Sequence, residues 1–116
     1  ERRKNGKLLQ ETMGWHPDLI IQKEIGKSSW FGFSLIIKPE SAWTRKDLVK
    51  KLTELGFECR PIVAGNFAKN AVVKYFDSEV HGDLKNAEHI DQNGLFIGNH
   101  HYPITDAIKA LNRVQL

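Results

Sequence analysis

Apolar positions along the chain fall into short groups, and the spacing inside each group indicates its secondary structure. Residues 28–38 carry the strongest strand pattern, because aromatic and β-branched side chains gather there before a proline. Residues 44–55 have helical spacing instead: Thr44 is typical of an N-cap, Asp47 stands three residues later, and leucines recur until Gly56. These two segments are the clearest elements of the sequence.

The remaining elements follow from the same patterns. We predict helices at 1–13, 70–76, 86–93 and after Thr105 as an N-cap, and strands at 19–25, 57–63 and 95–97. A turn at 64–67, a loop at 77–83 and a polar corner at 98–101 connect them. Strands that alternate with helices through short connections predict an α+β fold, a small antiparallel or mixed sheet with helices packed on one face.

Composition bounds the class of protein. With 116 residues, of which 27% are charged and 41% hydrophobic, the chain suits one globular domain, which we place at 1–116. The formal charge of +3 is mild, and its basic cluster at the chain start predicts a solvated helix face and no nucleic-acid partner. No apolar run approaches the roughly 18 residues of a membrane span, so we expect a cytoplasmic protein without a membrane partner.

The start of the chain is unusual. Residue 1 is Glu1, the only methionine is Met13, and the sequence opens inside a helical pattern. We therefore expect a piece of a longer protein, in which residues 1–14 are the end of an interdomain helix.

The segment from Gly56 to Phe67 combines a carboxylate, a guanidinium and an amide. Period-two alternation places Glu58 and Arg60 on one face of a strand and Cys59 on the other. The strand then runs into a turn that contains Asn66. This set of groups suits hydroxyls and oxyanions, which predicts a sugar or phosphate ligand. The alternative is an exposed ion pair worth about 0–1 kcal/mol.

The sequence gives little evidence for a metal site, a disulfide or a catalytic centre. The histidines lack the spacing of a metal site, and Cys59, the single cysteine, allows no internal disulfide. One of His100 and His101 is placed to reach a ligand at the polar corner, while a capping or core role also fits. The sequence has no glycine-rich phosphate loop, no catalytic triad and no lysine in an apolar setting, so it lacks a reaction centre of its own.

The aromatic stretch at 30–33 resembles the motif of RNA-recognition domains only superficially. That motif needs a basic residue and a glycine before its first aromatic side chain, whereas two serines precede Trp30 here. Core or interface packing explains these aromatic residues more simply.

Six segments, read in order, carry a more specific resemblance: SSWFGFSLIIK, RKDLVKKL, GFECRPIVAGNF, VVKYFD, NAEHIDQNGLFIGNH and TDAIKAL. Together they resemble the carboxy-terminal domain of the DegT/DnrJ/EryC1/StrS sugar aminotransferase family, and within it the nucleotide-sugar 3-dehydratases of lipopolysaccharide deoxysugar synthesis. The resemblance covers nearly the whole chain. It implies the small domain of the aspartate-aminotransferase fold, fold type I of the vitamin B6 enzymes.

The resemblance also implies an enzyme that works with pyridoxal or pyridoxamine phosphate (PLP or PMP) in its complete form. The cofactor and the catalytic base, a histidine in the 3-dehydratases and a lysine in the aminotransferases, would lie in an amino-terminal domain. No catalytic or cofactor-binding residue is therefore expected on this chain, and the piece alone is expected to be inactive. Its expected partners are that domain, a second subunit in a homodimer, and a nucleotide sugar whose nucleotide and hexose stay open.

Carried over residue by residue, the resemblance places Glu58 where the family contacts its sugar nucleotide. Neighbouring polar positions would complete the small domain's wall of a shared cleft, so the predicted substrate-binding residues are Glu58, Arg60, Asn66, Phe67, Asn99 and His100. Two alternatives stay open. One is the same domain in a PLP-dependent nucleotide-sugar aminotransferase, and the other is a non-catalytic, ferredoxin-like binding module.

Overall fold

The structure, a computed structural model, describes residues 1–115. Its elements along the chain are α1 (Arg2–Met13), β1 (Leu19–Ile21), β2 (Gly32–Ile37), α2 (Arg45–Glu54), β3 (Cys59–Arg60), the 3₁₀ helices η1 (Phe67–Lys69) and η2 (Ala71–Tyr75), α3 (Lys85–Asn93), β4 (Gly94–Gly98) and α4 (Thr105–Asn112). The strands form one four-stranded sheet in the order β1-β2-β4-β3, and every pairing is antiparallel. Within residues 1–115 no helix is both long and apolar enough to cross a membrane.

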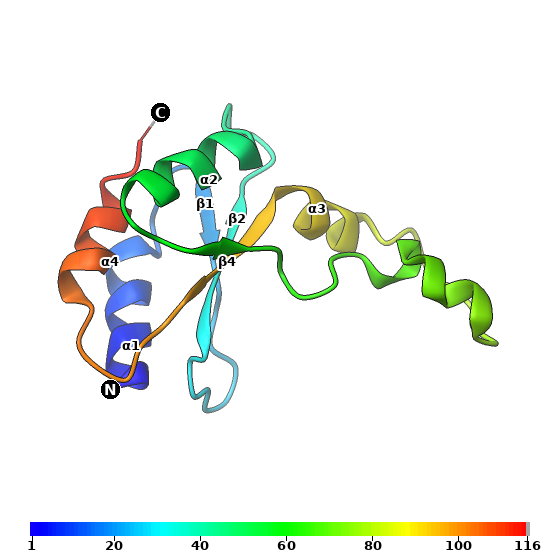
Figure 1. The fold of residues 1–116 in the computed structure, drawn as a ribbon, viewed down its shortest axis with the longest axis horizontal. Coiled ribbons are helices and arrows are strands. Elements are labelled where there is room, and N and C mark those ends of the chain that lie inside the picture. Colours follow the sequence, from blue (N-terminus) through cyan, green and yellow to red (C-terminus); the bar gives the residue numbers. More distant parts are fainter. Residues whose placement is uncertain (116) are drawn as a thin grey trace.

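One face of the sheet carries the core. Alternate residues of β2 and β4 point to this face and pair across the strands, Phe33 with Ile97 and Leu35 with Leu95. Helices α1, α2 and α4 cover it (Figure 1), and α1 packs beside α4. The buried hydrophobic residues are Leu9, Met13, Leu19, Trp30, Phe33, Leu35, Ile37, Trp43, Leu48, Leu52, Leu95, Ile97, Ile108, Leu111 and Val114. The predicted α+β class, with a small antiparallel sheet and helices on one face, is therefore confirmed.

Trp30 shortens the predicted strand at 28–38. Its backbone is left-handed, with φ of 52°, and its ring is buried against Gly6 in the middle of α1. A Cβ atom at Gly6 would lie 2.5 Å from that ring, so the helix needs glycine there. Because Trp30 turns under α1 in this way, regular pairing starts only at Gly32.

Two other predicted strands are also shorter than expected. The strand at 19–25 ends at Ile21, whose partner is Leu35. The strand at 57–63 is reduced to Cys59–Arg60, since Pro61 has no N–H to continue the ladder and Val63 has φ of 48°. The edge strand β3 is therefore very short.

The helices agree better with the predictions. Thr44 and Asp47 form the expected capping box of α2, and Gly56 follows that helix with φ of 84°. Thr105, in contrast, is not the N-cap of α4: Ile104 holds that position, and Thr105 is the first helical residue. The Ile104 N–H donates to the Asn5 side chain at 3.4 Å, so a residue of α1 positions this helix start.

Residues 62–84 form a projecting segment, which we call the arm. In Figure 1 it leaves β3, extends past α3 and returns to it (green to yellow). The short helix predicted at 70–76 is present as the 3₁₀ helix η2. The arm contributes no residue to the buried core. Its exposed large hydrophobic side chains are Val63, Phe67, Val72, Tyr75, Phe76 and Val80.

Candidate functional site

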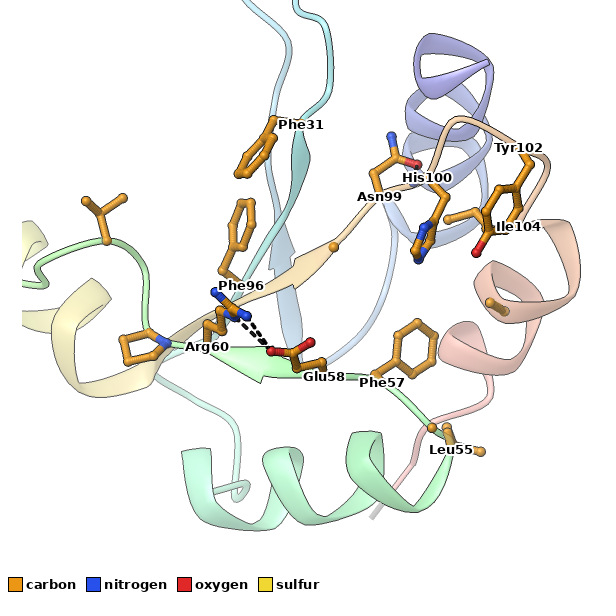
Figure 2. Close-up of a pocket in the computed structure, with 15 residues that line it drawn as sticks. Phe31, Leu55, Phe57, Glu58, Arg60, Phe96, Asn99, His100, Tyr102 and Ile104 are labelled. Carbon is orange, nitrogen blue, oxygen red and sulfur yellow. Dashed lines mark hydrogen bonds and ion pairs between the residues drawn. The ribbon is translucent and has the colours of Figure 1, made fainter.

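A groove of about 900 Å³ lies over β3 and the end of β4, between the C-terminus of α2 and the start of α4 (Figure 2). Its lining residues are Phe31, Leu55, Gly56, Phe57, Glu58, Arg60, Pro61, Val63, Phe96, Gly98, Asn99, His100, Tyr102, Ile104 and Ala107. Loop residues and a short edge strand thus surround one concave surface.

Glu58 and Arg60 form an ion pair inside this groove. Arg60 donates from Nε and Nη2 to the same oxygen, Oε1 of Glu58, at 2.9 and 2.6 Å. The two side chains are 76% and 71% exposed. Within residues 1–115, Oε2 of Glu58 accepts no hydrogen bond from a side chain or a backbone amide. The carboxylate is therefore oriented by Arg60 but still has acceptor capacity for a ligand.

Cys59 confirms the predicted sidedness of this strand. Its side chain is half-buried and packs against the hydrophobic core, opposite to its charged neighbours. Burial raises the pKa of the Cys59 thiol, which makes it a poor nucleophile at neutral pH. The thiol is a core group and takes no part in the groove.

An aromatic pair forms one end of the groove. Phe31 stacks on Phe96 with ring centroids 5.7 Å apart and planes inclined by 26°, and 72% of Phe31 is exposed. The Phe96 ring lies over Gly32, where a Cβ atom would come within 2.2 Å of it. Phe96 is also the direct cross-strand partner of Arg60. A flat apolar surface therefore adjoins the ion pair.

The polar corner forms the other end. His100 stacks on Tyr102 with centroids 4.7 Å apart. The Asn99 side chain donates to the carbonyl groups of Arg2 and Trp30 at 3.0 and 2.8 Å and accepts from Asn5 at 3.1 Å. Asn99 thus ties the corner to α1 and has little capacity left for a ligand, whereas the ring of His100 is exposed to the groove.

Asn66 and Phe67 lie elsewhere. Asn66 is only 8% exposed, and its Nδ2 donates to Oε2 of Glu88 at 3.3 Å. Phe67 lines a separate cavity of about 260 Å³ on the arm. The structure therefore brings Glu58, Arg60, Asn99 and His100 together and leaves these two predicted residues outside the groove.

The sequence prediction overlooked Phe31 and Tyr102. Core packing holds for Trp30 and Phe33, but Phe31 faces the groove because the left-handed backbone at Trp30 changes the alternation. Tyr102 directly follows the predicted corner. Its aromatic ring next to two histidines could have indicated that it belongs to the candidate site.

The chain is similar in sequence and in structure to known proteins. The chain is 53% identical over 111 residues to the GDP-4-keto-6-deoxy-D-mannose 3-dehydratase of Yersinia pseudotuberculosis, and 53% identical over 114 residues to the protein of that name from Escherichia coli O55:H7. It also superimposes on the solved structure of the E. coli enzyme with bound hydrated PLP, with a TM-score of 0.91 over 96% of the chain. The chain is homologous to these 3-dehydratases.

The resemblance that the sequence motifs predicted is thereby confirmed. A solved mutant of the 3-dehydratase, with bound GDP-perosamine, matches this chain with a TM-score of 0.90. No family model matches the chain. The alignments cover 95% and 97% of this chain but 28% and 29% of the two relatives, so the chain spans less than a third of the 3-dehydratases that it matches.

Proposed function

We propose that this chain is the substrate-capping small domain of a nucleotide-sugar 3-dehydratase, which removes the C3 hydroxyl of a GDP-4-keto-6-deoxyhexose in lipopolysaccharide deoxysugar synthesis. One observation carries the proposal: 53% identity and a TM-score of 0.91 to a GDP-4-keto-6-deoxy-D-mannose 3-dehydratase extend over 96% of the chain. The groove supports it independently, because the predicted residues Glu58, Arg60, Asn99 and His100 line one concave surface.

The role of this chain is to bind and enclose the sugar nucleotide. The Glu58–Arg60 pair presents both an acceptor and donors at the groove floor, and His100 adds a third polar group. The apolar side chains around them exclude water when the rest of the enzyme closes the open side. Asn66 and Phe67 lie outside the groove. In this proposal they affect the sugar nucleotide indirectly, through the position of the arm.

The groove by itself does not fit the cofactor. Within the described residues that line it there is no lysine, and its one guanidinium is already paired with Glu58. We therefore assign PLP or PMP, and the base that PLP chemistry needs, to the remainder of the complete protein. When bound there, the cofactor supplies the electron sink for removal of the C3 hydroxyl.

The partner proposal includes that remainder and a second subunit. The arm supports a macromolecular contact, because six of its large apolar side chains are exposed on one projecting segment. Replacing Tyr75 and Phe76 together with serine in the complete protein should shift a homodimer toward monomer in sedimentation experiments. A cytoplasmic location remains a prediction from the sequence.

The function is tested with the complete protein, PLP, glutamate and GDP-4-keto-6-deoxymannose. The expected products are a 3-deoxy keto-sugar nucleotide and ammonia. Accumulation of a stable amino sugar without ammonia release would instead identify a sugar aminotransferase. A histidine at the Schiff-base position of the remaining sequence supports the dehydratase, and a lysine there supports the aminotransferase.

A further inference from the structure

We infer that Asn5 of α1 is a positioning residue: it holds residues 99–104 against α1 and so determines how the ring of His100 is presented. The effect on turnover rests on the proposed function, because that function supplies the substrate. The hydrogen bonds that carry the inference are internal to this chain, and none of them involves β3.

Asn5 is an unusual residue for its position in the chain. Asn5 and Gly6 are neighbours inside α1, where both are buried although both are weak helix formers. Gly6 leaves room for the ring of Trp30. Asn5 is only 3% exposed, and a buried amide needs hydrogen-bond partners. The pair therefore indicates that this turn of the helix makes specific tertiary contacts at the cost of helix propensity.

The side chain of Asn5 is hydrogen-bonded at both ends. Its Nδ2 donates to Oδ1 of Asn99 at 3.1 Å and to the carbonyl groups of His100 and Tyr102 at 3.2 and 2.9 Å. Its Oδ1 accepts from the N–H of Ile104 at 3.4 Å. A single amide group thus contacts four groups between residues 99 and 104.

A second amide extends this contact to the start of β2. Nδ2 of Asn99 donates to the carbonyl groups of Arg2 and Trp30, and Oδ1 of Asn99 also accepts from the N–H of His100 at 2.8 Å. Phe31, the residue after Trp30, forms the aromatic end of the groove. The first turns of α1 therefore hold the two ends of the groove relative to each other.

The contact requires an asparagine. Three of its four partners are acceptors and one is a donor, so the side chain must offer N–H groups and an oxygen at fixed positions. Aspartate has the same shape but would set a carboxylate against three oxygen atoms. Leucine would leave all four groups without their partner.

Few other contacts fix residues 99–104. Ile104 is the one side chain among them that packs against the hydrophobic core, and it is only partly buried. Figure 2 shows His100 and Tyr102 at the groove, where they stack on each other. Their position therefore depends on the two amides, and loss of Asn5 should displace the ring of His100.

The competing explanation is that Asn5 only stabilises the fold. A double-mutant cycle with His100→Ala separates the two explanations, because that substitution removes the ring but keeps the carbonyl that Asn5 contacts. An effect of Asn5 that passes through the ring disappears in this background. An effect on stability alone does not.

The experiment measures KM and kcat for the GDP-sugar with the complete, PLP-loaded protein. Asn5→Asp should raise KM about tenfold and change kcat by less than about threefold, since the proposed function places the reacting groups in the remainder of the protein. With His100→Ala already present, Asn5→Asp should have little further effect on KM, while it lowers the melting temperature equally in both backgrounds. Asn5→Ser, a smaller change, gives the same comparison if the aspartate variant does not fold.

Met13→Ala is the matched control, since Met13 lies on the same helix, is fully buried and is outside the groove. It should lower the melting temperature and leave KM unchanged. Amide hydrogen exchange adds a measurement that needs no turnover. Asn5→Asp should accelerate exchange of residues 99–104 by about tenfold or more relative to the sheet, and Met13→Ala should not.

The inference is overturned if Asn5→Asp leaves KM unchanged, or if it raises KM equally with and without the ring of His100. Either result leaves the proposed function standing as long as the wild-type protein converts its substrate. Absence of turnover in a PLP-loaded wild-type protein would contradict the proposed function instead. Hydrogen exchange would then decide on Asn5, and unchanged exchange of residues 99–104 would overturn its role.

Discussion

Two glycines face each other across the central strand pair and have opposite roles. Gly32 and Gly98 are direct partners in the β2–β4 register. A Cβ atom at Gly32 would meet the Phe96 ring at 2.2 Å and the Ile97 carbonyl at 2.7 Å, whereas one at Gly98 would meet nothing within 4 Å. The first glycine is needed for packing, and the second leaves the groove floor open.

This difference predicts the outcome of a matched pair of substitutions. Gly98→Val should fill the groove and weaken binding of the proposed GDP-sugar ligand by the complete protein, with a change in unfolding free energy within about 0.5 kcal/mol. Gly32→Ala should lower the unfolding free energy by about 1–3 kcal/mol, because both neighbours would have to move. Urea denaturation and ligand titration measure the two effects. Loss of folding in the Gly98 variant would contradict an open floor at that position.

Val63 carries local strain at the rim of the groove. It is β-branched, has φ of 48°, and is 93% exposed. A left-handed β-branched residue is an outlier, and such positions cost of order 1–3 kcal/mol. Since almost no packing would be lost, Val63→Gly should raise the unfolding free energy by about 1 kcal/mol after the entropy cost of glycine.

The control for Val63 is Val80→Gly, on the same arm and also exposed, but with an ordinary backbone. That change should be neutral or destabilising in urea denaturation. Equal effects of the two substitutions would show that the strain at Val63 does not matter. Reduced turnover of Val63→Gly in the complete protein, despite higher stability, would show that the strained turn positions the groove rim.

At the scale of elements, the sequence predicted correctly those helices and strands whose bounds depend on nearby residues alone. The helix at 45–54 was predictable because its capping box and its leucine spacing are both contained in the sequence of the helix itself. The end of β3 was not, since it depends on which residues β4 offers as partners and on the turn at Val63. The start of α4 depends on Asn5, which is 99 residues away in sequence.

In the candidate site, too, some residue positions follow from the local sequence and others depend on tertiary contacts. The shared face of Glu58 and Arg60 was predictable because strand alternation alone determines it. The location of Asn66 was not predictable, because Asn66 turns toward Glu88 of α3 when the chain enters the arm. The role of Phe31 depends on the buried ring of Trp30, a tertiary contact without a local signature.

Glu88 anchors the arm to α3, and this anchor should respond to pH. Hydrogen bonds from Lys69 and Asn66 hold the pKa of the Glu88 carboxyl below its ordinary value of 4.5. The anchored form therefore opposes protonation: its stabilisation is fully present above pH 4.5 and is lost as the pH falls through the lowered pKa. Amide hydrogen exchange of the arm, corrected for intrinsic rates, should accelerate in that acid range before the core does.

Glu88→Gln removes the charge but keeps the shape of the side chain. In this variant the arm should already exchange rapidly at neutral pH, and acid should accelerate it little further. Asp77→Asn, at an exposed position of the arm, is the control and should behave as the wild type. If acid still accelerated exchange of the arm in Glu88→Gln, a titratable group other than Glu88 would be responsible.

At the scale of the whole molecule, the core and the groove are built from different parts of the chain. The buried core residues come from 9–52 and from 95–114, and between these ranges the partly buried side chains of Phe57 and Cys59 pack against the core. Helix α1, from the start of the chain, packs against α4, near its end. The first and last helices therefore belong to the same hydrophobic core. The groove and the arm lie outside this core, which leaves them free to contact other polypeptide.

This division predicts that the 116-residue chain folds by itself but does not act by itself. Its core is continuous, so circular dichroism should show one cooperative thermal transition. It should not retain PLP after gel filtration and should not convert the GDP-sugar, because no residue of its groove fits the cofactor. Adding the separately produced remainder of the complete protein should restore both properties if the two parts reassemble. Retention of PLP or turnover by the chain alone would show that the cofactor site is at least partly formed here, and the assignment of the base to the remainder would then be wrong.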